Sequence, residues 1–159
     1  MKTEHTIVWH YTTGDAFLGI LRDGHIRAST GGQTPNEKPI TWFSTEPLWE
    51  PTVYKKLMRP DGTGEQLGMS GLLAHGFQLI RIGAPAGVAP LRWTDIKEQS
   101  GIPVHEQRWM ARVSKDLGGN PSRWRGAWGA VQIVGQLAVI ERFDTALNAW
   151  VALPTEEAA

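Results

Sequence analysis

Strand-like runs outnumber helical runs in this chain, and the two kinds do not alternate. Apolar, β-branched or aromatic residues predict strands at 6–11, 40–44, 76–82, 128–134, 137–143 and 149–153, with a shorter extended piece at 26–29. Apolar spacing predicts helices at 13–23, 94–100 and 104–117, and a short helical turn at 54–58. Regular alternation would indicate a doubly wound parallel sheet, so its absence favours an α+β fold with a few small helices.

Length, cysteine content and charge limit the classes of protein that fit. The 159 residues suit one domain, 1–159, with a short polar tail at 154–159. Because the chain has no cysteine, disulfide scaffolds, thiolate metal sites and a Cys nucleophile are excluded, and its five scattered histidines predict no metal site. Equal numbers of basic and acidic residues, 16 each, argue against a broad nucleic-acid surface but leave room for a local basic groove.

Targeting signals and membrane spans are not expected. No apolar stretch follows a basic start, and no window of about 18 apolar residues exists, so we expect a soluble cytoplasmic protein without a membrane partner. The eight tryptophans, against two tyrosines, supply flat aromatic surface for packing or for stacking on a planar ligand.

The first motif that bears on chemistry is Trp9-His10-Tyr11-Thr12-Thr13. His10 stands at the end of an apolar strand, just before a turn. A histidine followed by hydroxyls can direct hydrogen-bond donors and acceptors at a ribose or a phosphate. A half-buried histidine that closes the end of a strand explains the same residues.

The second motif is Ile40-Thr41-Trp42-Phe43-Ser44-Thr45, another strand that ends in hydroxyls. Alternation places Trp42 and Phe43 on opposite faces of the strand. One ring can therefore face the core while the other faces a cleft, where it could stack on a nicotinamide or a base. The bland alternative is a central strand covered on both faces.

Taken together, the two motifs and the segment Leu18–Ser29 between them resemble the ADP-ribosyltransferase fold. The likeness covers residues 6–52. It is greatest to the branch with a histidine on the first strand and an aromatic residue on the second, which includes poly-ADP-ribose polymerase catalytic domains, DNA-modifying ADP-ribosyltransferase toxins and RNA 2′-phosphotransferases. The resemblance implies a split β-sheet clamp that binds NAD as co-substrate, without a metal.

The resemblance also implies roles for particular residues. His10 would hold the adenosine-side ribose of NAD, helped by its neighbours in the motif, and an aromatic ring of the second motif would stack on the nicotinamide. Ser44 would lie near the nicotinamide ribose, and an arginine would meet the pyrophosphate because its fork suits phosphate oxygens. The cofactor-binding residues predicted in this way are His10, Tyr11, Thr12, Arg22, Arg27, Trp42, Phe43 and Ser44.

The catalytic carboxylate is the point at which the chain departs from the family pattern. The family places a glutamate on a late strand, where it stabilises the charge that builds on the sugar. The predicted strand 128–134 has only Gln132 as a long polar group, which supplies no negative charge. Glu141, on a strand but next to Arg142, and Glu106, on a predicted helix, are the other candidates.

The resemblance therefore implies an NAD-dependent ADP-ribosyltransferase, or an NAD glycohydrolase, that cleaves the nicotinamide–ribose bond. Its target would be a protein or a short nucleic-acid segment, and its size would suit a toxin-like modifier. The missing glutamate leaves an inactive NAD- or nucleotide-binding module, or a partner-binding protein of the same fold, as the alternative. Phosphotransfer from RNA to NAD would need more basic residues than Arg22, Arg27 and Arg81 supply.

One further motif is Trp124-Arg125-Gly126-Ala127-Trp128. An arginine between tryptophans can serve a partner that carries phosphates or nucleobases, through cation–π and stacking contacts. The alternative is an aromatic cluster that packs under a loop.

Overall fold

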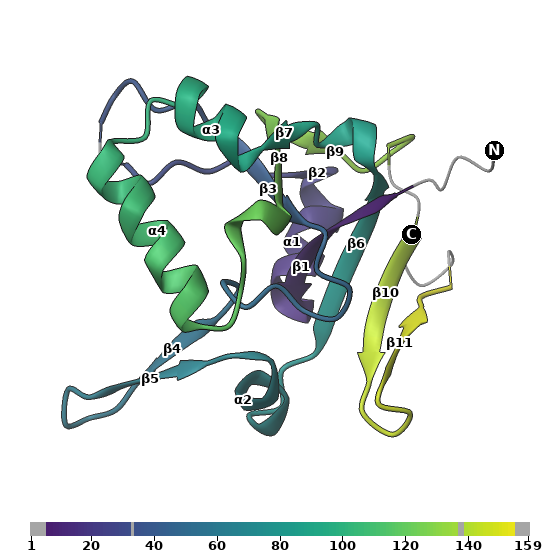
Figure 1. Cartoon of the computed structure of the whole chain (residues 1–159). Helices are drawn as coiled ribbons and strands as arrows, with labels where there is room; N and C mark the ends of the chain where they lie inside the picture. The colour runs from purple at the N-terminus through teal and green to yellow at the C-terminus, as the bar shows by residue number, and fades with distance from the viewer. Residues whose placement is uncertain (1–5, 33, 137–138, 155–159) are drawn as a thin grey trace.

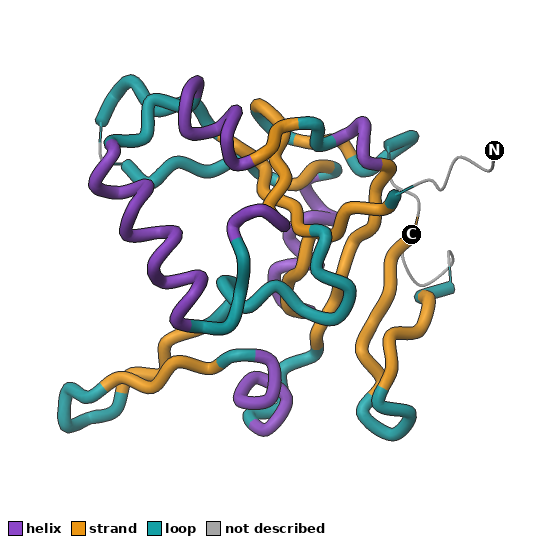
Figure 2. The backbone as a smooth tube through the Cα atoms, in the orientation of Figure 1, coloured by secondary structure: helices purple, strands orange, loops and turns teal. Residues whose placement is uncertain are grey.

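The computed structural model describes residues 6–32, 34–136 and 139–154. They form a mixed α+β fold in which one antiparallel sheet dominates and short helices lie around it (Figure 1, Figure 2). The strands are β1 (Ile7–Thr13), β2 (His25–Ile26), β3 (Ile40–Ser44), β4 (Lys55–Met58), β5 (Gly64–Leu67), β6 (Leu79–Pro85), β7 (Leu91–Arg92), β8 (Trp124–Trp128), β9 (Val131–Gln132), β10 (Val139–Asp144) and β11 (Ala149–Ala152). The α-helices are α1 (Gly14–Asp23), α2 (Met69–Ala74), α3 (Trp93–Gln99) and α4 (Val104–Asp116).

The main sheet has the order β11-β10-β6-β1-β3-β8-β7. β1 pairs with β6 along its whole length, from Ile7 opposite Pro85 to Thr13 opposite Leu79. On its other side β1 meets β3 at one registered position, Trp9 opposite Ser44. The sheet therefore has a seam between β1 and β3, where backbone pairing is nearly lost.

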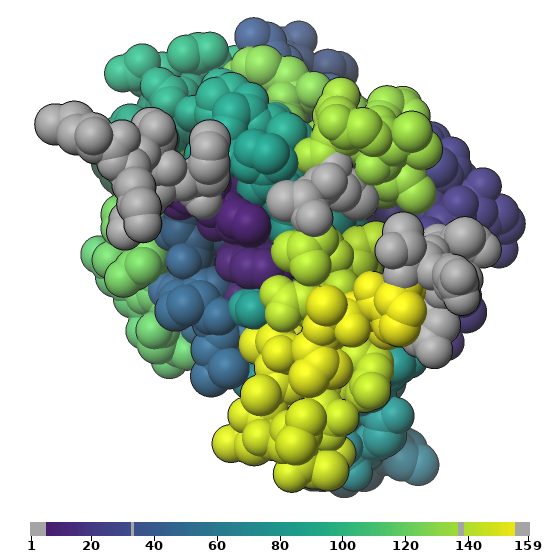
Figure 3. Space-filling view, turned by 90° about the vertical axis from the view of Figure 1, so that its right-hand side faces the viewer, coloured from purple at the N-terminus to yellow at the C-terminus, as the bar shows by residue number. Residues whose placement is uncertain are grey.

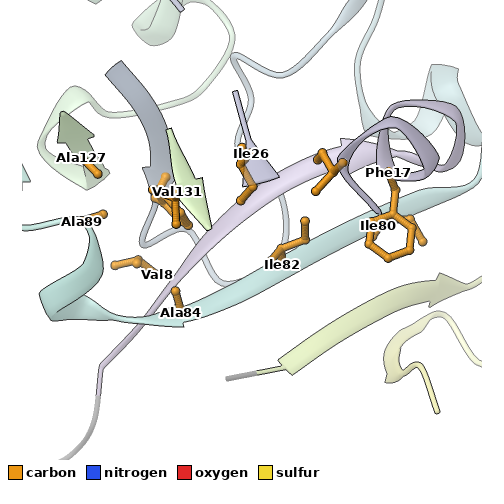
Figure 4. Packing of buried hydrophobic residues seen from close by; sticks show 11 residues of the cluster. Val8, Phe17, Ile26, Ile80, Ile82, Ala84, Ala89, Ala127 and Val131 are labelled. Carbon is orange, nitrogen blue, oxygen red and sulfur yellow. The ribbon is translucent and has the colours of Figure 1, made fainter. Parts of the chain in front are cut away.

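One face of the sheet packs on α1. Val8 and Ile82 are buried there with Phe17 of the helix (Figure 4). Phe43 of β3 and Ile20 of α1 belong to the same cluster. Helix α1 begins directly after β1 and ends at Gly24, whose φ of 76° lets its N–H bond to the Ile20 carbonyl. This local stop signal turns the chain back beneath the strands.

The opposite face of the sheet is dominated by tryptophans. One cluster, centred on Tyr11 and Trp49, is covered by α2 and by the β10–β11 hairpin. That hairpin, in yellow, lies at the surface in the lower part of the view in Figure 3. A second cluster joins Trp93 and Trp124, whose ring centroids lie 4.9 Å apart, to Trp42. The large flat rings therefore mainly fill the core of this face.

Most of the predicted elements are confirmed. The strands at 6–11 and 40–44 and the helices at 13–23, 94–100 and 104–117 all form, with boundary shifts of a few residues. The last two predicted strands, at 137–143 and 149–153, pair as the hairpin β10–β11. Parts of two predicted segments lie outside the described residues. They are residues 137–138 of the strand predicted at 137–143 and residues 155–159 of the predicted tail. Across the described ranges, no helix is at once long enough and apolar enough to reach through a bilayer.

Two predicted elements are wrong, and α2 was not predicted. Residues 54–58 are not a helical turn, because β4 pairs with β5 in a hairpin closed by the Arg59–Glu65 ion pair at 2.8 Å. The strand expected at 128–134 is not continuous: β8 ends at Trp128, and in the rest of the range only Val131–Gln132 forms a strand, β9. Gly129 ends β8 with a φ of 72°, which a strand cannot continue through.

Candidate functional site

A cavity of about 320 Å³ opens at the seam between β1 and β3. Its lining includes five of the residues predicted to bind a ligand: His10, Tyr11, Trp42, Phe43 and Ser44. The other walls come from the loop that follows β3, from α4 and from the start of β8. The volume lies near the lower end of the roughly 300–1,000 Å³ usual for small-molecule sites.

His10 bridges the seam with its side chain. Its Nδ1 lies 2.7 Å from the Trp42 carbonyl oxygen of β3. Since a carbonyl can only accept, Nδ1 is the donor, and in the neutral ring Nε2 is left as an acceptor. Burial lowers the pKa of His10 below its ordinary value, and the bond to Trp42 only partly opposes this. The ring is therefore neutral at pH 7 and offers Nε2 to a hydroxyl donor.

The two adjacent rings of β3 take opposite faces, as alternation predicts. Phe43 is 3% exposed in the α1-facing core, with its ring 5.8 Å from that of His10 in an edge-on arrangement. Trp42 is half-buried on the other face, edge-on to Trp124 at 5.8 Å. Both Trp42 and Phe43 nevertheless line the cavity.

Glu50, a residue that sequence reasoning missed, places a carboxylate in the cavity wall. It is 5% exposed, on the loop after β3. Its Oε2 accepts a hydrogen bond from Ser44 Oγ at 2.6 Å, and its Oε1 accepts from Thr52 Oγ1 at 2.7 Å and from Trp124 Nε1 at 3.2 Å. These bonds fix the position of a carboxylate that comes from the loop after β3 and not from the expected late strand.

Helix α4 supplies the wall opposite the sheet, through Trp109, Met110 and Val113. The Trp109 side chain is 51% exposed, so this ring is free to meet a ligand. Tyr54, at the end of the loop after β3, lies in the same lining. These aromatic positions were also missed, because only the fold brings α4 against the β1–β3 seam.

Three predicted ligand-binding residues do not line the cavity. Thr12 is 7% exposed within β1 and lies beyond the lining. Arg22 and Arg27 are exposed on and after α1, and both approach Asp23, with Arg27 Nη2 2.8 Å from its carboxylate. The structure therefore places neither arginine in the cavity that contains His10.

The three predicted catalytic residues also lie outside the cavity lining. Gln132 is exposed on β9, where it pairs with His25 of β2. Glu106 is half-buried in the first turn of α4. Glu141 on β10 forms an ion pair with Arg81 of β6 at 3.1 Å, although Arg142 is its neighbour in sequence.

The described part of the chain contains no group of three His, Cys, Asp or Glu side chains placed to hold a metal ion. No protein-family model, curated protein or solved structure matches the chain. The functional argument therefore depends on the residues of the cavity themselves.

Proposed function

We propose that the chain binds NAD in the β1–β3 cavity, cleaves its nicotinamide–ribose bond, and transfers ADP-ribose to water or to a macromolecular acceptor. One observation carries the proposal: His10, the rings of β3 and a buried carboxylate, Glu50, line a single cavity. A fixed carboxylate can stabilise the positive charge that develops on the sugar in glycosidic cleavage. Aromatic walls and a neutral histidine suit the binding of a planar base and a ribose hydroxyl.

The binding step uses the ring walls and His10. A cavity of about 320 Å³ suits one nucleoside-sized group, so the nicotinamide ribose would lie inside and the rest of the dinucleotide would extend along the seam. Trp42 or Trp109 would stack on the nicotinamide, and Nε2 of His10 would accept a hydrogen bond from a ribose hydroxyl.

The chemical step uses Glu50. As the bond from the sugar C1′ to nicotinamide breaks, positive charge develops on the ribose, and nicotinamide leaves as a neutral molecule with the bonding electron pair. A carboxylate held by donors from its own chain needs no reorganisation to stabilise that charge. Ser44, which the resemblance places near this ribose, donates to Glu50 at 2.6 Å. Glu50 thus replaces Gln132, Glu106 and Glu141 as our candidate for the catalytic residue.

The finer fold assignment belongs to the same proposal. The single registered pair between β1 and β3 supports a split-sheet clamp of the ADP-ribosyltransferase type, because such a clamp needs strands that part around the ligand. The side-chain bond from His10 to Trp42 spans the parting strands.

Nicotinamide release, with NAD affinity measured by calorimetry, tests the proposal. We expect His10→Ala to weaken NAD binding roughly tenfold, the equivalent of one lost hydrogen bond. Glu50→Gln should slow nicotinamide release by about 10²–10³-fold while NAD still binds. Glu98→Gln, the same change at an exposed position on α3, is the matched control and should change neither quantity.

Binding without cleavage is the second candidate function. The observation that favours it is that both Glu50 oxygens already accept hydrogen bonds from the chain. NAD affinity without nicotinamide release would establish this alternative. If the wild-type protein neither bound nor cleaved NAD, both proposals would be refuted.

A further inference from the structure

Three arginines gather where β7 and β8 form the edge of the sheet (Figure 1). Arg92 of β7 stands directly opposite Arg125 of β8, and Arg123 precedes Arg125 by two residues. Like charges that face each other across an antiparallel pair are destabilising. Burial and the charges of Arg92 and Arg123 lower the pKa of Arg125, which is consistent with this crowding.

No carboxylate of the described residues forms an ion pair with any of these three arginines, whereas Arg59 and Arg142 each have one. Arg125 is held by its own backbone surroundings, because Nη1 donates to the carbonyls of Ser122 at 2.9 Å and Trp124 at 2.7 Å. Arg92 and Arg123 are exposed. The cluster is thus one guanidinium held by backbone carbonyls and flanked by two exposed arginines, and the one carboxylate bonded to this group, Asp95, accepts the backbone N–H of Arg92 at 2.9 Å, with no ion pair to its side chain among the described residues.

The arginine cluster is continuous with the cavity wall. The Arg123 carbonyl accepts the backbone N–H of Thr45 at 2.9 Å, directly after Ser44 of β3. Trp124, between Arg123 and Arg125, lines the cavity and donates to Glu50. The register places Arg125 opposite Phe43 and Trp124 opposite Ser44, so the arginines lie on the other face of β8 from the Trp124 ring and adjoin the cavity wall through the backbone of residues 123–125.

We propose that Arg92, Arg123 and Arg125 bind successive phosphates of a single-stranded nucleic acid. Arginine forks match phosphate oxygens, and three cations give the short footprint that a chain of zero net charge can support. At the other end of β8, Trp128 is 38% exposed with Lys38 Nζ 5.1 Å from its ring centre, which suits a base-stacking position. This assigns a partner to the Trp124–Trp128 motif.

The role of the bound nucleic acid as the acceptor of ADP-ribose rests on the proposed function of the cavity. A nitrogen or oxygen of the bound nucleotide would form the new bond to C1′ of the NAD ribose as the bond to nicotinamide breaks. Nicotinamide would leave with the bonding pair, and the proton of the acceptor atom would pass to solvent. The phosphate-binding step itself does not depend on this chemistry.

Fluorescence anisotropy with a labelled single-stranded oligothymidylate, titrated at several salt concentrations, tests the site. We expect R92Q/R123Q to weaken binding at least about tenfold and to reduce the slope of log K against log salt by about 1.4, because each single-strand phosphate contact contributes about 0.7. R92K/R123K should retain most of the affinity. R59Q/R142Q removes the same charge from arginines with carboxylate partners and should behave as wild type.

The proposal is overturned if the wild-type protein shows no salt-dependent binding, or if R59Q/R142Q loses as much affinity as R92Q/R123Q. It is also overturned if R92Q/R123Q weakens NAD binding, since the arginines would then hold the NAD diphosphate. Oligonucleotide binding without nicotinamide release would instead refute cleavage in the cavity and leave the phosphate site standing.

Discussion

Replacing Arg81 tests whether Glu141 serves the fold rather than a reaction. Arg81 is 9% exposed on β6. Its guanidinium carbon lies 3.8 Å from the ring centre of Trp9 and 4.7 Å from that of Trp150. Its two terminal nitrogens donate to the Pro47 carbonyl at 2.7 Å and to the Glu141 carboxylate at 3.1 Å. One cation therefore connects β6 to its neighbouring strands and to the loop after β3.

The size of the effect follows from these contacts. Arg81→Met removes two cation–π contacts, each worth about 0.5–2 kcal/mol, and leaves the Glu141 carboxylate unpaired. Breaking a buried pair in this way costs about 3–5 kcal/mol. The two side chains are 10% and 15% exposed, so water screens the pair only weakly. We expect a loss of about 3–5 kcal/mol in the free energy of unfolding.

A double-mutant cycle with Arg81→Met and Glu141→Gln, followed by denaturant unfolding, measures the pair. We expect a coupling energy of about 1–3 kcal/mol. Arg81→Lys keeps the charge without the planar fork, so it should fall between wild type and Arg81→Met. A coupling below about 0.3 kcal/mol would refute this account. So would a Glu141→Gln variant of unchanged stability that no longer releases nicotinamide, because Glu141 would then act in catalysis.

Two further predictions concern stability. Burial lowers the pKa of His10 below 6.5 in the folded protein. Just below pH 6.5 the His10 imidazole therefore takes up a proton in the unfolded chain but not in the folded one. The free energy of unfolding should fall as the pH drops from about 7.5 to about 5.5. Denaturant midpoints of wild type and His10→Asn check this, and equal slopes in both would contradict it. Gly83→Ala places a Cβ 2.7 Å from Trp9 Cζ3 and should lower the free energy of unfolding by about 1–3 kcal/mol. The control is Gly87→Ala, whose Cβ meets nothing within 4 Å. Equal melting temperatures for the two variants would refute this prediction.

The fold could be predicted best where the signals are local. The α1 region carries its own stop at Gly24, and β3 is a dense β-branched and aromatic run, so both elements formed as expected. β8 was misplaced because its stability comes from pairing with β3, from Ile40 opposite Trp128 to Ser44 opposite Trp124. The four residues of β4 are all exposed, so neither face of the strand is buried and no alternation of polar and apolar residues marks it in the sequence. Its hairpin is fixed by its partner strand and turn.

Only some residues of the candidate site could be predicted from the sequence. The chemistry of His10 and Ser44 is visible in the sequence because hydroxyl residues follow or end these strand-like runs. Ser44 does end β3, but β1 continues to Thr13, so His10 lies in mid-strand and not at the strand end that its motif predicts. Arg22 and Arg27 were misplaced because a basic residue near a motif in sequence says nothing about which side of a helix faces the site. Asp23 lies beside both of them instead.

Glu50 shows why other residues of the site were missed. A carboxylate between Trp49 and Pro51 in an irregular loop has no periodicity that would indicate burial. Its position depends on Trp124, a donor 74 residues further along the chain. The resemblance places the glutamate on a late strand. In the structure β8 contributes instead the indole N–H of Trp124, which holds the Glu50 carboxylate of the loop after β3. Buried carboxylates with converging donors therefore indicate a candidate functional charge where strand order alone does not.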